Sequence, residues 1–362
     1  MKQKSNLLLA MFCLSISIQT VAGQTVRRNG PLASAKAIPE PTLFVPGVIS
    51  TGDYEVCPQF SLDEKTFYFV KSTPDANFWT IVVSQLEKGK WSAPRVAPFS
   101  GQYSDADEFI TRDGKQMFFI STRPLLNATN KEPRKLDIWM MDKTATGWGE
   151  PRNLGARVNS EQSEYFPTLT NDGTLYFGSR RAGGKGGVDL YRSRVVNGTY
   201  QEPENLGNAI NTTFDEFEPF IAPDESFLVF MAGGRPDGLG GFDLYITYNR
   251  NGQWTKAKNL GAPINSGADE LSPRITFDGK YFFWASARST IDKPKDKSWS
   301  FAELSNAYHA PGNGLGDIYY IDVSALKLEK SIARPNTSKQ NEVIATQPLA
   351  VDPCHRRQSL GS

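Results

Sequence analysis

Apolar and polar residues alternate in short runs along most of the chain, and turn-forming residues separate these runs. Two typical runs, Thr174–Ser179 and Ser226–Ala232, are rich in aromatic and branched side chains. Runs of this kind favour β-strands over helices. The step Asp172-Gly173 just before the first run favours a tight hairpin between two strands. The pattern therefore predicts an all-β chain.

The chain repeats itself. The octet NLGARVNS at 153–160 recurs as NLGNAINT at 205–212 and as NLGAPINS at 259–266. An acidic residue lies 11 positions after the start of each octet, and an aspartate lies eight positions after that acid. The same acid–aspartate pair occurs twice earlier, which gives five copies. The acids are Glu55, Asp105, Glu164, Glu216 and Glu270, and the aspartates are Asp63, Asp113, Asp172, Asp224 and Asp278.

Each copy predicts four short strands, which we name A to D. Strand A begins at the acid, strand B follows the aspartate turn, and strand D carries an aromatic residue and runs into the octet. Strand C begins with an Asp-x-aromatic triplet, at Asp137, Asp189, Asp243 and Asp317. Four strands in a repeat of about 50 residues make a blade of a β-propeller. A blade cannot bury its faces alone, so the copies are expected to stack in a ring.

The two ends of the repeat region indicate how the ring closes. The fifth copy stops after Asp317–Val323 without a fourth strand. The segment Phe44–Glu55 lies in the register of the octet, with Val45 at the leucine position and Ile49 at the valine position. A strand at about residues 36–46 should therefore complete the last blade and remove the open edge. We predict five blades. A six-bladed ring that uses residues 24–41 and the C-terminal tail is the alternative.

The N-terminus has the pattern of a secretory signal. Lys2 and Lys4 precede the apolar stretch Leu7–Ile18, which is too short to span a bilayer, and small residues at Val21–Gly23 suit cleavage before Gln24. We expect a signal peptide at 1–23, a propeller at 24–330 and a flexible, polar tail at 331–362. The protein should be monomeric, periplasmic, secreted or at the cell surface, without a transmembrane segment.

The cysteines leave two questions open. A lipid anchor on Cys13 is an alternative to cleavage, although Phe12 stands where such signals have a small residue. An oxidising compartment would permit a disulfide between Cys57 and Cys354. We favour a buried thiol at Cys57, because this residue lies in a predicted core strand.

The sequence "EYFPTLTNDGTLYFGSRRAGGKGGVDLYRS…EPENLGNAIN" resembles the WD40-like repeats called PD40, which occur in TolB-type propellers. It is most similar to exported Bacteroidetes-type proteins that carry these repeats beside OmpA-like domains. The resemblance covers roughly Phe44–Val323 and implies a propeller that serves as a periplasmic or cell-surface interaction module. The sequence shows neither an OmpA-like domain nor a TolB-like N-terminal domain, so a Tol–Pal-type role is not expected.

Charge and loop lengths narrow the choice of partner. The chain has 40 basic and 39 acidic side chains, which argues against nucleic acid or an anionic membrane held by bulk charge. Two long connections, Pro124–Leu136 and Arg288–Gly316, both join strand B to strand C. They should lie on the face where the strands A begin, and long loops commonly carry function. This B–C face is the predicted functional face.

The acids that open the strands A would form a ring on that face. Such a ring could hold a structural calcium or the hydroxyls of a sugar. Arginines end strand B in four blades, so the alternative is that each acid pairs with a base of its own blade. The candidate ligand-binding residues of the ring are Glu55, Asp105, Glu164, Glu216 and Glu270, with Arg123, Arg180, Arg235 and Arg288.

The blade-five loop, Lys297–Asp317, adds further candidates. Trp299, Tyr308 and His309 lie on it, and aromatic side chains on a polar loop can stack on a sugar or anchor a peptide. The alternative is a lid whose aromatic residues pack over the mouth of the channel.

Signals for catalysis are sparse. The chain has two histidines, His309 and His355, and no G-x-S-x-G motif. The glycine runs at 183–187 and 238–241 are not followed by predicted helices and are therefore turns rather than phosphate-binding loops. We predict no catalytic residue, metal site or required cofactor. The predicted function is an exported propeller that binds an envelope protein or a glycan. The alternative is a glycan-active hydrolase or lyase with carboxylates in the central channel.

Overall fold

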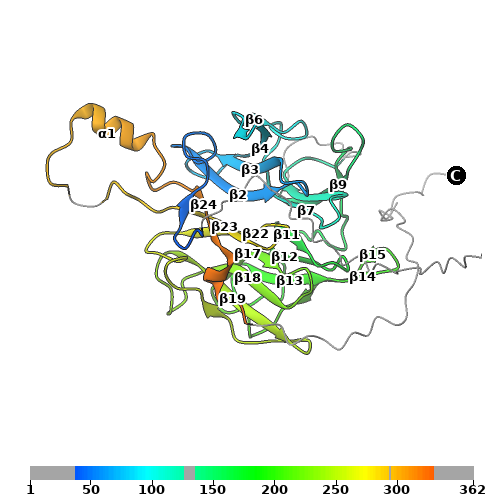
Figure 1. The fold of residues 1–362 in the computed structure, drawn as a ribbon. Helices are drawn as coiled ribbons and strands as arrows, with labels where there is room; N and C mark the ends of the chain where they lie inside the picture. The colour runs from blue at the N-terminus through cyan, green and yellow to red at the C-terminus, as the bar shows by residue number, and fades with distance from the viewer. Residues whose placement is uncertain (1–36, 126–134, 293–294, 330–362) are drawn as a thin grey trace, which may run out of the picture.

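The computed structural model describes residues 37–125, 135–292 and 295–329. Five antiparallel sheets surround a common axis (Figure 1). Within each sheet the strands follow one another from the axis outward, as the sequence predicts. The fold is a five-bladed β-propeller, and the six-bladed alternative is wrong. The signal segment, the C-terminal tail, Cys13 and Cys354 lie outside the described residues.

The strands of successive blades correspond closely. Strands A are β2 (Tyr54–Phe60), β7 (Asp105–Ile110), β11 (Glu164–Leu169), β17 (Asp215–Ile221) and β22 (Glu270–Ile275). Strands B are β3 (Thr66–Ser72), β8 (Gln116–Ser121), β12 (Leu175–Ser179), β18 (Phe227–Gly233) and β23 (Tyr281–Ser286). Strands C are β4 (Trp79–Glu87), β9 (Asp137–Asp142), β13 (Asp189–Ser193), β19 (Phe242–Arg250) and β24 (Asp317–Asp322).

The outer strands D are only two residues long. They are β6 (Arg95–Val96), β10 (Arg152–Asn153), β16 (Glu204–Asn205), β21 (Lys258–Asn259) and, from the N-terminus, β1 (Thr42–Leu43). The aromatic residues that we expected in strand D lie instead at the C–D turns, in β5 (Lys90–Trp91), β15 (Thr199–Tyr200) and β20 (Gln253–Trp254). There β15 pairs with β14 (Val195–Val196). The helical elements are α1 (Phe301–Tyr308) and the 3-10 turn η1 (Val323–Leu326).

The N-terminal segment closes the last blade. β1 pairs antiparallel with β24, and the Phe44 N–H donates to the Ile318 carbonyl at 2.8 Å. In blade two the Leu154 N–H donates to the Ile138 carbonyl in the same way. Phe44, and not Val45, therefore occupies the leucine position, because the closing segment contains one extra residue. Ile49 is fully buried, as expected for the valine position.

The octets repeat because their asparagines join strand D to strand C. The Asn159 side chain accepts from the Ile138 N–H at 2.8 Å and donates to the Ile138 carbonyl at 3.0 Å. It also donates to the Asn153 amide oxygen at 2.9 Å. Asn205 with Asn211 and Asn259 with Asn265 make the same contacts in the next two blades.

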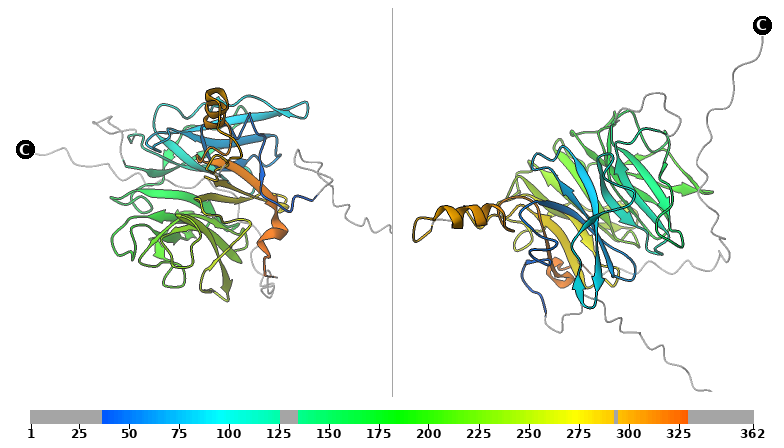
Figure 2. Two further views of the ribbon diagram at one scale, coloured as in Figure 1. Left: turned by 90° about the vertical axis from the view of Figure 1, so that its left-hand side faces the viewer. Right: turned by 90° about the horizontal axis from the view of Figure 1, so that it is seen from above.

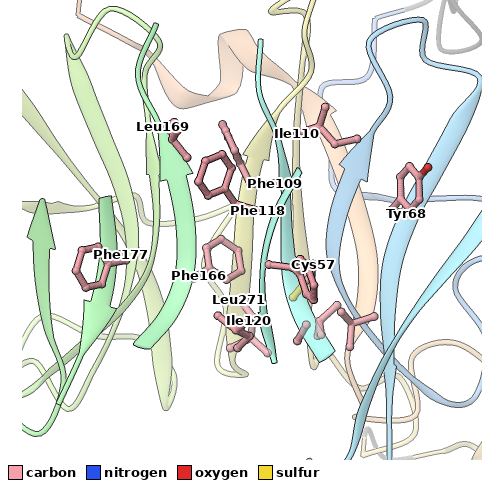
Figure 3. Close-up of a cluster of buried hydrophobic side chains, with 14 of the residues drawn as sticks. Cys57, Tyr68, Phe109, Ile110, Phe118, Ile120, Phe166, Leu169, Phe177 and Leu271 are labelled. Carbon is pink, nitrogen blue, oxygen red and sulfur yellow. The ribbon is translucent and has the colours of Figure 1, made fainter. Parts of the chain in front are cut away.

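The apolar residues of strands A to C pack between neighbouring blades (Figure 3). Each A–B turn is held by its aspartate, whose carboxylate accepts a hydrogen bond from the N–H two residues later; the Thr174 N–H donates to Asp172 at 3.1 Å. Asp63, Asp113, Asp224 and Asp278 do the same. These turns lie on one face of the ring, and the B–C loops lie on the other.

Candidate functional site

The predicted ring acids are buried inside their own blades. Glu164 has no exposed side-chain surface and accepts from the N–H and the hydroxyl of Ser160, at 3.1 and 2.6 Å. The same two hydrogen bonds reach three other ring acids, from Thr51 to Glu55, from Thr212 to Glu216 and from Ser266 to Glu270. Burial raises the pKa of each of these four glutamates, and the hydrogen bonds oppose that rise.

A base at the end of strand B also faces each acid. Arg123 contacts Asp105 at 2.8 Å and Arg235 contacts Glu216 at 2.7 Å. In blade three the partner of Glu164 is Arg181, at 3.2 Å, so the expected role of Arg180 was wrong by one residue. Lys71 serves Glu55 at 3.1 Å, and Arg288 lies 3.5 Å from Glu270.

These contacts correspond to the architectural alternative for the ring. The acids make their contacts within their own blades and do not converge on one point. Among the described residues, no group of three or more His, Cys, Asp or Glu side chains is arranged to hold a metal ion.

The blade-five loop stands out from the propeller and contains α1 (Figures 1 and 2). No side chain of α1 is buried, and Phe301 is 85% exposed. Tyr308 is also exposed, Trp299 lies under the Lys295 ammonium at 5.1 Å, and the His309 ring contacts the Ser305 carbonyl at 2.7 Å. The base of the loop is fixed by Asn313, which donates to the Gly52 carbonyl at 3.0 Å. The described part of the loop does not form a lid.

The axis of the propeller is lined by a different position. In each strand A the pairing shifts just after the opening acid, and the residue two positions after the acid has a positive φ of 50° to 59°. This left-handed conformation costs free energy for residues other than glycine. Bulges of this kind commonly re-aim a side chain at a functional site. The five residues are Cys57, Asp107, Phe166, Glu218 and Ser272.

These five residues contact one another across the blades, and we call them the floor. The Cys57 thiol donates to Asp107 at 3.2 Å and lies 3.5 Å from the Ser272 hydroxyl. The second Asp107 oxygen accepts the Phe166 N–H at 2.9 Å. Glu218 accepts the Ser272 N–H. Figure 3 shows Cys57 and Phe166 among the strands A. Cys57 is a free, buried thiol, as the sequence favours.

A cavity of about 400 Å³ stands on the floor, and we call it the funnel. It lies at the B–C face, because its lining includes the start of β2 and the B–C turn of blade one. Cys57, Asp107 and Glu218 line its bottom, and none of the five ring acids lines it. The aromatic residues of its wall are Tyr54, Trp79, Tyr165, Phe217 and Phe242.

A buried charged layer lies beneath the floor. The Arg274 guanidinium lies 4.1 Å from the centre of the Phe166 ring and is 3.5 Å from the Glu108 carbonyl. Glu108 has no exposed surface, and neither oxygen of its carboxyl group has a hydrogen-bond partner among the described residues. A second cavity of about 250 Å³, which Arg274 also lines, opens from the opposite face.

Burial changes the acid–base behaviour of this region. Desolvation raises the pKa of Asp107 to about 6. Desolvation, together with the nearby Asp107 carboxylate, raises the pKa of Glu218 to about 8. Burial also raises the pKa of Glu108 and of the Cys57 thiol well above their usual values, and lowers the pKa of Arg274. Perturbed carboxyl groups that line a cavity are candidates for a functional site.

Sequence reasoning missed the floor, although the repeats contain a signal for it. Once the five strands A are aligned on their acids, four copies have proline three positions after the acid, and blade two has Glu108. The position two residues after the acid holds four kinds of side chain in the five copies: a thiol, a carboxyl group in two copies, an aromatic ring and a hydroxyl. A position that varies among otherwise similar repeats does not make a contact that every blade needs, so it is a candidate for a functional role.

Comparisons with known proteins add little beyond the fold. No protein-family model and no curated protein matches the chain, so the PD40 resemblance remains a prediction. TolB from Acinetobacter baumannii is 16% identical over 74% of this chain, which spans 54% of the TolB chain, with a TM-score of 0.42. A putative glycoside hydrolase from Bacteroides ovatus is 9% identical over 83% of this chain and 97% of its own, also at 0.42. Similarity at this level carries no argument about function.

Proposed function

We propose that this chain is an exported ligand-binding propeller of the cell envelope, and that it takes its ligand, a glycan or part of an envelope protein, into the funnel at the B–C face. The funnel carries this proposal: an aromatic wall stands above two buried carboxyl groups in one cavity of about 400 Å³. Concave, mostly apolar cavities with a few convergent polar groups are the usual form of a ligand site.

The backbone supports the same location. Five residues with positive φ, one in each blade, place their side chains around the axis. The same backbone strain, a positive φ, occurs at this level in every blade. The side chains that it directs to the axis differ in kind, which supports a ligand rather than packing as its purpose. The structural contacts within each blade are made by the ring acids, which lie two residues before the floor residues, as in the ion pair of Glu216 with Arg235.

The proposed location in the envelope rests on the N-terminal sequence. The basic residues, the short apolar stretch and the small residues at 21–23 together form the pattern of an export signal. In the part of the chain that the structure describes, no helix is both long enough and apolar enough to cross a membrane.

The test compares two candidate surfaces on one protein. The purified mature protein is applied to a glycan array and to immobilised envelope proteins, with and without calcium. Two double variants are run beside it: Tyr165→Ala/Phe217→Ala opens the funnel wall, and Trp299→Ala/Tyr308→Ala alters the blade-five loop. We expect binding to be lost in the funnel variant and kept in the loop variant. Loss in the loop variant alone would move the site to that loop and refute the proposal.

A glycan-cleaving activity is the second candidate, and the carboxyl pair of the funnel favours it. Asp107 and Glu218 line one cavity with pKa values of about 6 and about 8. Hydrolysis of a glycosidic bond needs one carboxyl group that stays protonated near neutral pH and a second that is ionised. Release of reducing ends from a bound glycan, abolished by Glu218→Gln, would support this candidate. Binding without release would exclude it for that glycan.

A further inference from the structure

The wall of the funnel presents aromatic rings to whatever enters it. Tyr165 and Phe217 meet edge to face at 5.8 Å, and Phe217 and Phe242 do so at 6.1 Å. Trp79 and Tyr54 extend the wall into blade one. The faces of aromatic rings attract cations, and the attraction strengthens where water is excluded.

The floor and the layer beneath it contain more acids than bases. Three carboxyl groups, those of Asp107, Glu108 and Glu218, act on one another or on the Cys57 thiol. Arg274 is the single base that acts on all three in the part of the chain that is described. Burial disfavours the ionised form of all three carboxyl groups, so a further positive group that entered this region would favour their ionisation and would be attracted to them.

Arg274 is also poorly placed to neutralise the floor from above. Its guanidinium lies against the Phe166 ring and near the Glu108 backbone, on the side of the second cavity. Asp107 and Glu218 line the funnel, whereas Arg274 does not. A positive group that entered from the B–C face would meet these two carboxyl groups without displacing a protein cation.

We propose that the funnel binds a protonated alkylamine, either a free amine or the end of a lysine side chain on a partner, with its ammonium group between Asp107 and Glu218 and its alkyl chain along the aromatic wall. This inference rests on the proposed function of the funnel and names the class of its ligand. A compact ammonium suits carboxylates and ring faces together, because it donates to the former and lies against the latter. An inorganic cation does not suit the site, since the described acids do not converge as a metal-ligand set.

The first measurement needs no variant. Isothermal titration on the full mature protein compares pentylamine with pentanol. It also compares Nα-acetyl-lysine amide, whose side-chain ammonium is free, with Nα-acetyl-norleucine amide. We expect each amine to bind at least about tenfold more tightly than its neutral partner, as an ion–carboxylate contact and cation–ring contacts in a desolvated site allow. Stronger binding of the lysine compound than of pentylamine would identify a lysine-bearing partner as the source, and the reverse order a free amine. Equal affinity of amines and neutral partners would refute the inference.

Two variants then locate the bound amine. Glu218→Gln keeps the shape of the floor and removes a carboxyl group that a bound ammonium would ionise, and Phe217→Leu removes a ring while keeping an apolar wall. Glu161→Gln, at an exposed glutamate of the same face, is the matched control. We expect both funnel variants to weaken amine binding about tenfold and the control to change it less than twofold. The circular dichroism and unfolding midpoint of each variant establish that it is folded.

The outcomes separate this inference from the proposed function. If amines and neutral compounds bind equally and Phe217→Leu weakens both, the funnel is a ligand site but not an amine site. If amines bind and neither funnel variant changes the affinity, the amine site lies elsewhere and the amine inference fails, while the glycan array with the Tyr165→Ala/Phe217→Ala variant decides the proposed function. If amines do not bind while the funnel variant abolishes binding on the glycan array, only the amine inference fails.

Discussion

Replacing Arg181 by alanine tests whether the ring acids are architectural. The Arg181 guanidinium donates to Glu164 at 3.2 Å, to the Val158 carbonyl at 2.6 Å and to the Ser179 hydroxyl at 3.2 Å. Its neighbour Arg180 is exposed, and the structure shows no ion pair for it among the described residues. Arg180→Ala is therefore a matched control that removes the same charge one residue away.

The expected magnitude follows from the burial of Glu164, whose side chain has no exposed surface. Removing one partner of a buried ion pair costs about 3–5 kcal/mol, because the other charge stays buried without compensation. Glu164 would keep the hydroxyl groups of Ser160 and Ser179 and the Lys135 ammonium at 3.7 Å. We therefore expect a loss of about 2–3 kcal/mol for Arg181→Ala, and less than about 0.5 kcal/mol for Arg180→Ala.

Urea unfolding at neutral pH measures both variants through the midpoint and the slope of the transition. A third variant, Glu164→Gln/Arg181→Ala, removes the uncompensated charge and should recover part of the loss. The pH dependence gives an independent check. Without Arg181 the pKa of Glu164 in the folded state rises further, and the unfolded state is the same in both proteins, so the deficit develops as the pH rises through the already raised folded-state pKa of Glu164 in the original protein. It should therefore shrink at about pH 4.

Two results would refute this reasoning. Equal destabilisation by Arg180→Ala would show that general charge in this region matters, rather than the pair with Glu164. An Arg181→Ala variant with unchanged stability and a higher affinity for a ligand would show that Glu164 is available for binding, as a functional ring requires.

Three further predictions concern closure, the octets and the floor. Phe44→Ala should cost about 3–5 kcal/mol, because this ring packs within 5.1 Å of the rings of both adjoining blades, whereas Phe301→Ala should be neutral; urea midpoints decide. Asn159→Ala should cost about 2–3 kcal/mol through its three lost hydrogen bonds, against less than about 0.5 kcal/mol for the exposed Asn171→Ala, and equal losses would contradict the role of the octet. The pKa of Glu218 is raised to about 8, so its contribution to stability is present below its unfolded pKa and is lost as the pH rises toward 8. In Glu218→Gln, the fall in the free energy of unfolding between about pH 5 and pH 8.5 should therefore be smaller by more than about 1 kcal/mol. An unchanged pH dependence would exclude the raised pKa of Glu218.

Repetition made the fold predictable from the sequence. Positions that recur among the copies make contacts that the blades share. The opening acid pairs with the basic residue that ends strand B, the aspartate holds the A–B turn, and in three copies asparagines join the outer strand D to strand C. Periodicity fixes such positions to within one residue, and two of the errors are of that size. Arg181 rather than Arg180 meets Glu164, since only the second arginine has the geometry to reach back to strand A. Phe44 rather than Val45 follows the closing strand, because the closing segment holds one extra residue.

The floor was not predictable by the same route, and the physical reason is its backbone. In a regular strand, side chains alternate between two faces, so the residue two positions after the acid would share the side of the acid. The bulge after the acid changes this rule, because a positive φ turns Cys57, Asp107 and Glu218 toward the axis. Four of the five copies have a thiol, hydroxyl or carboxyl group at this position, whereas packing alone would favour the apolar choice made at Phe166. The chemistry of this propeller is therefore to be sought where its repeats disagree, and the funnel above Asp107 and Glu218 is the place where that disagreement meets a cavity.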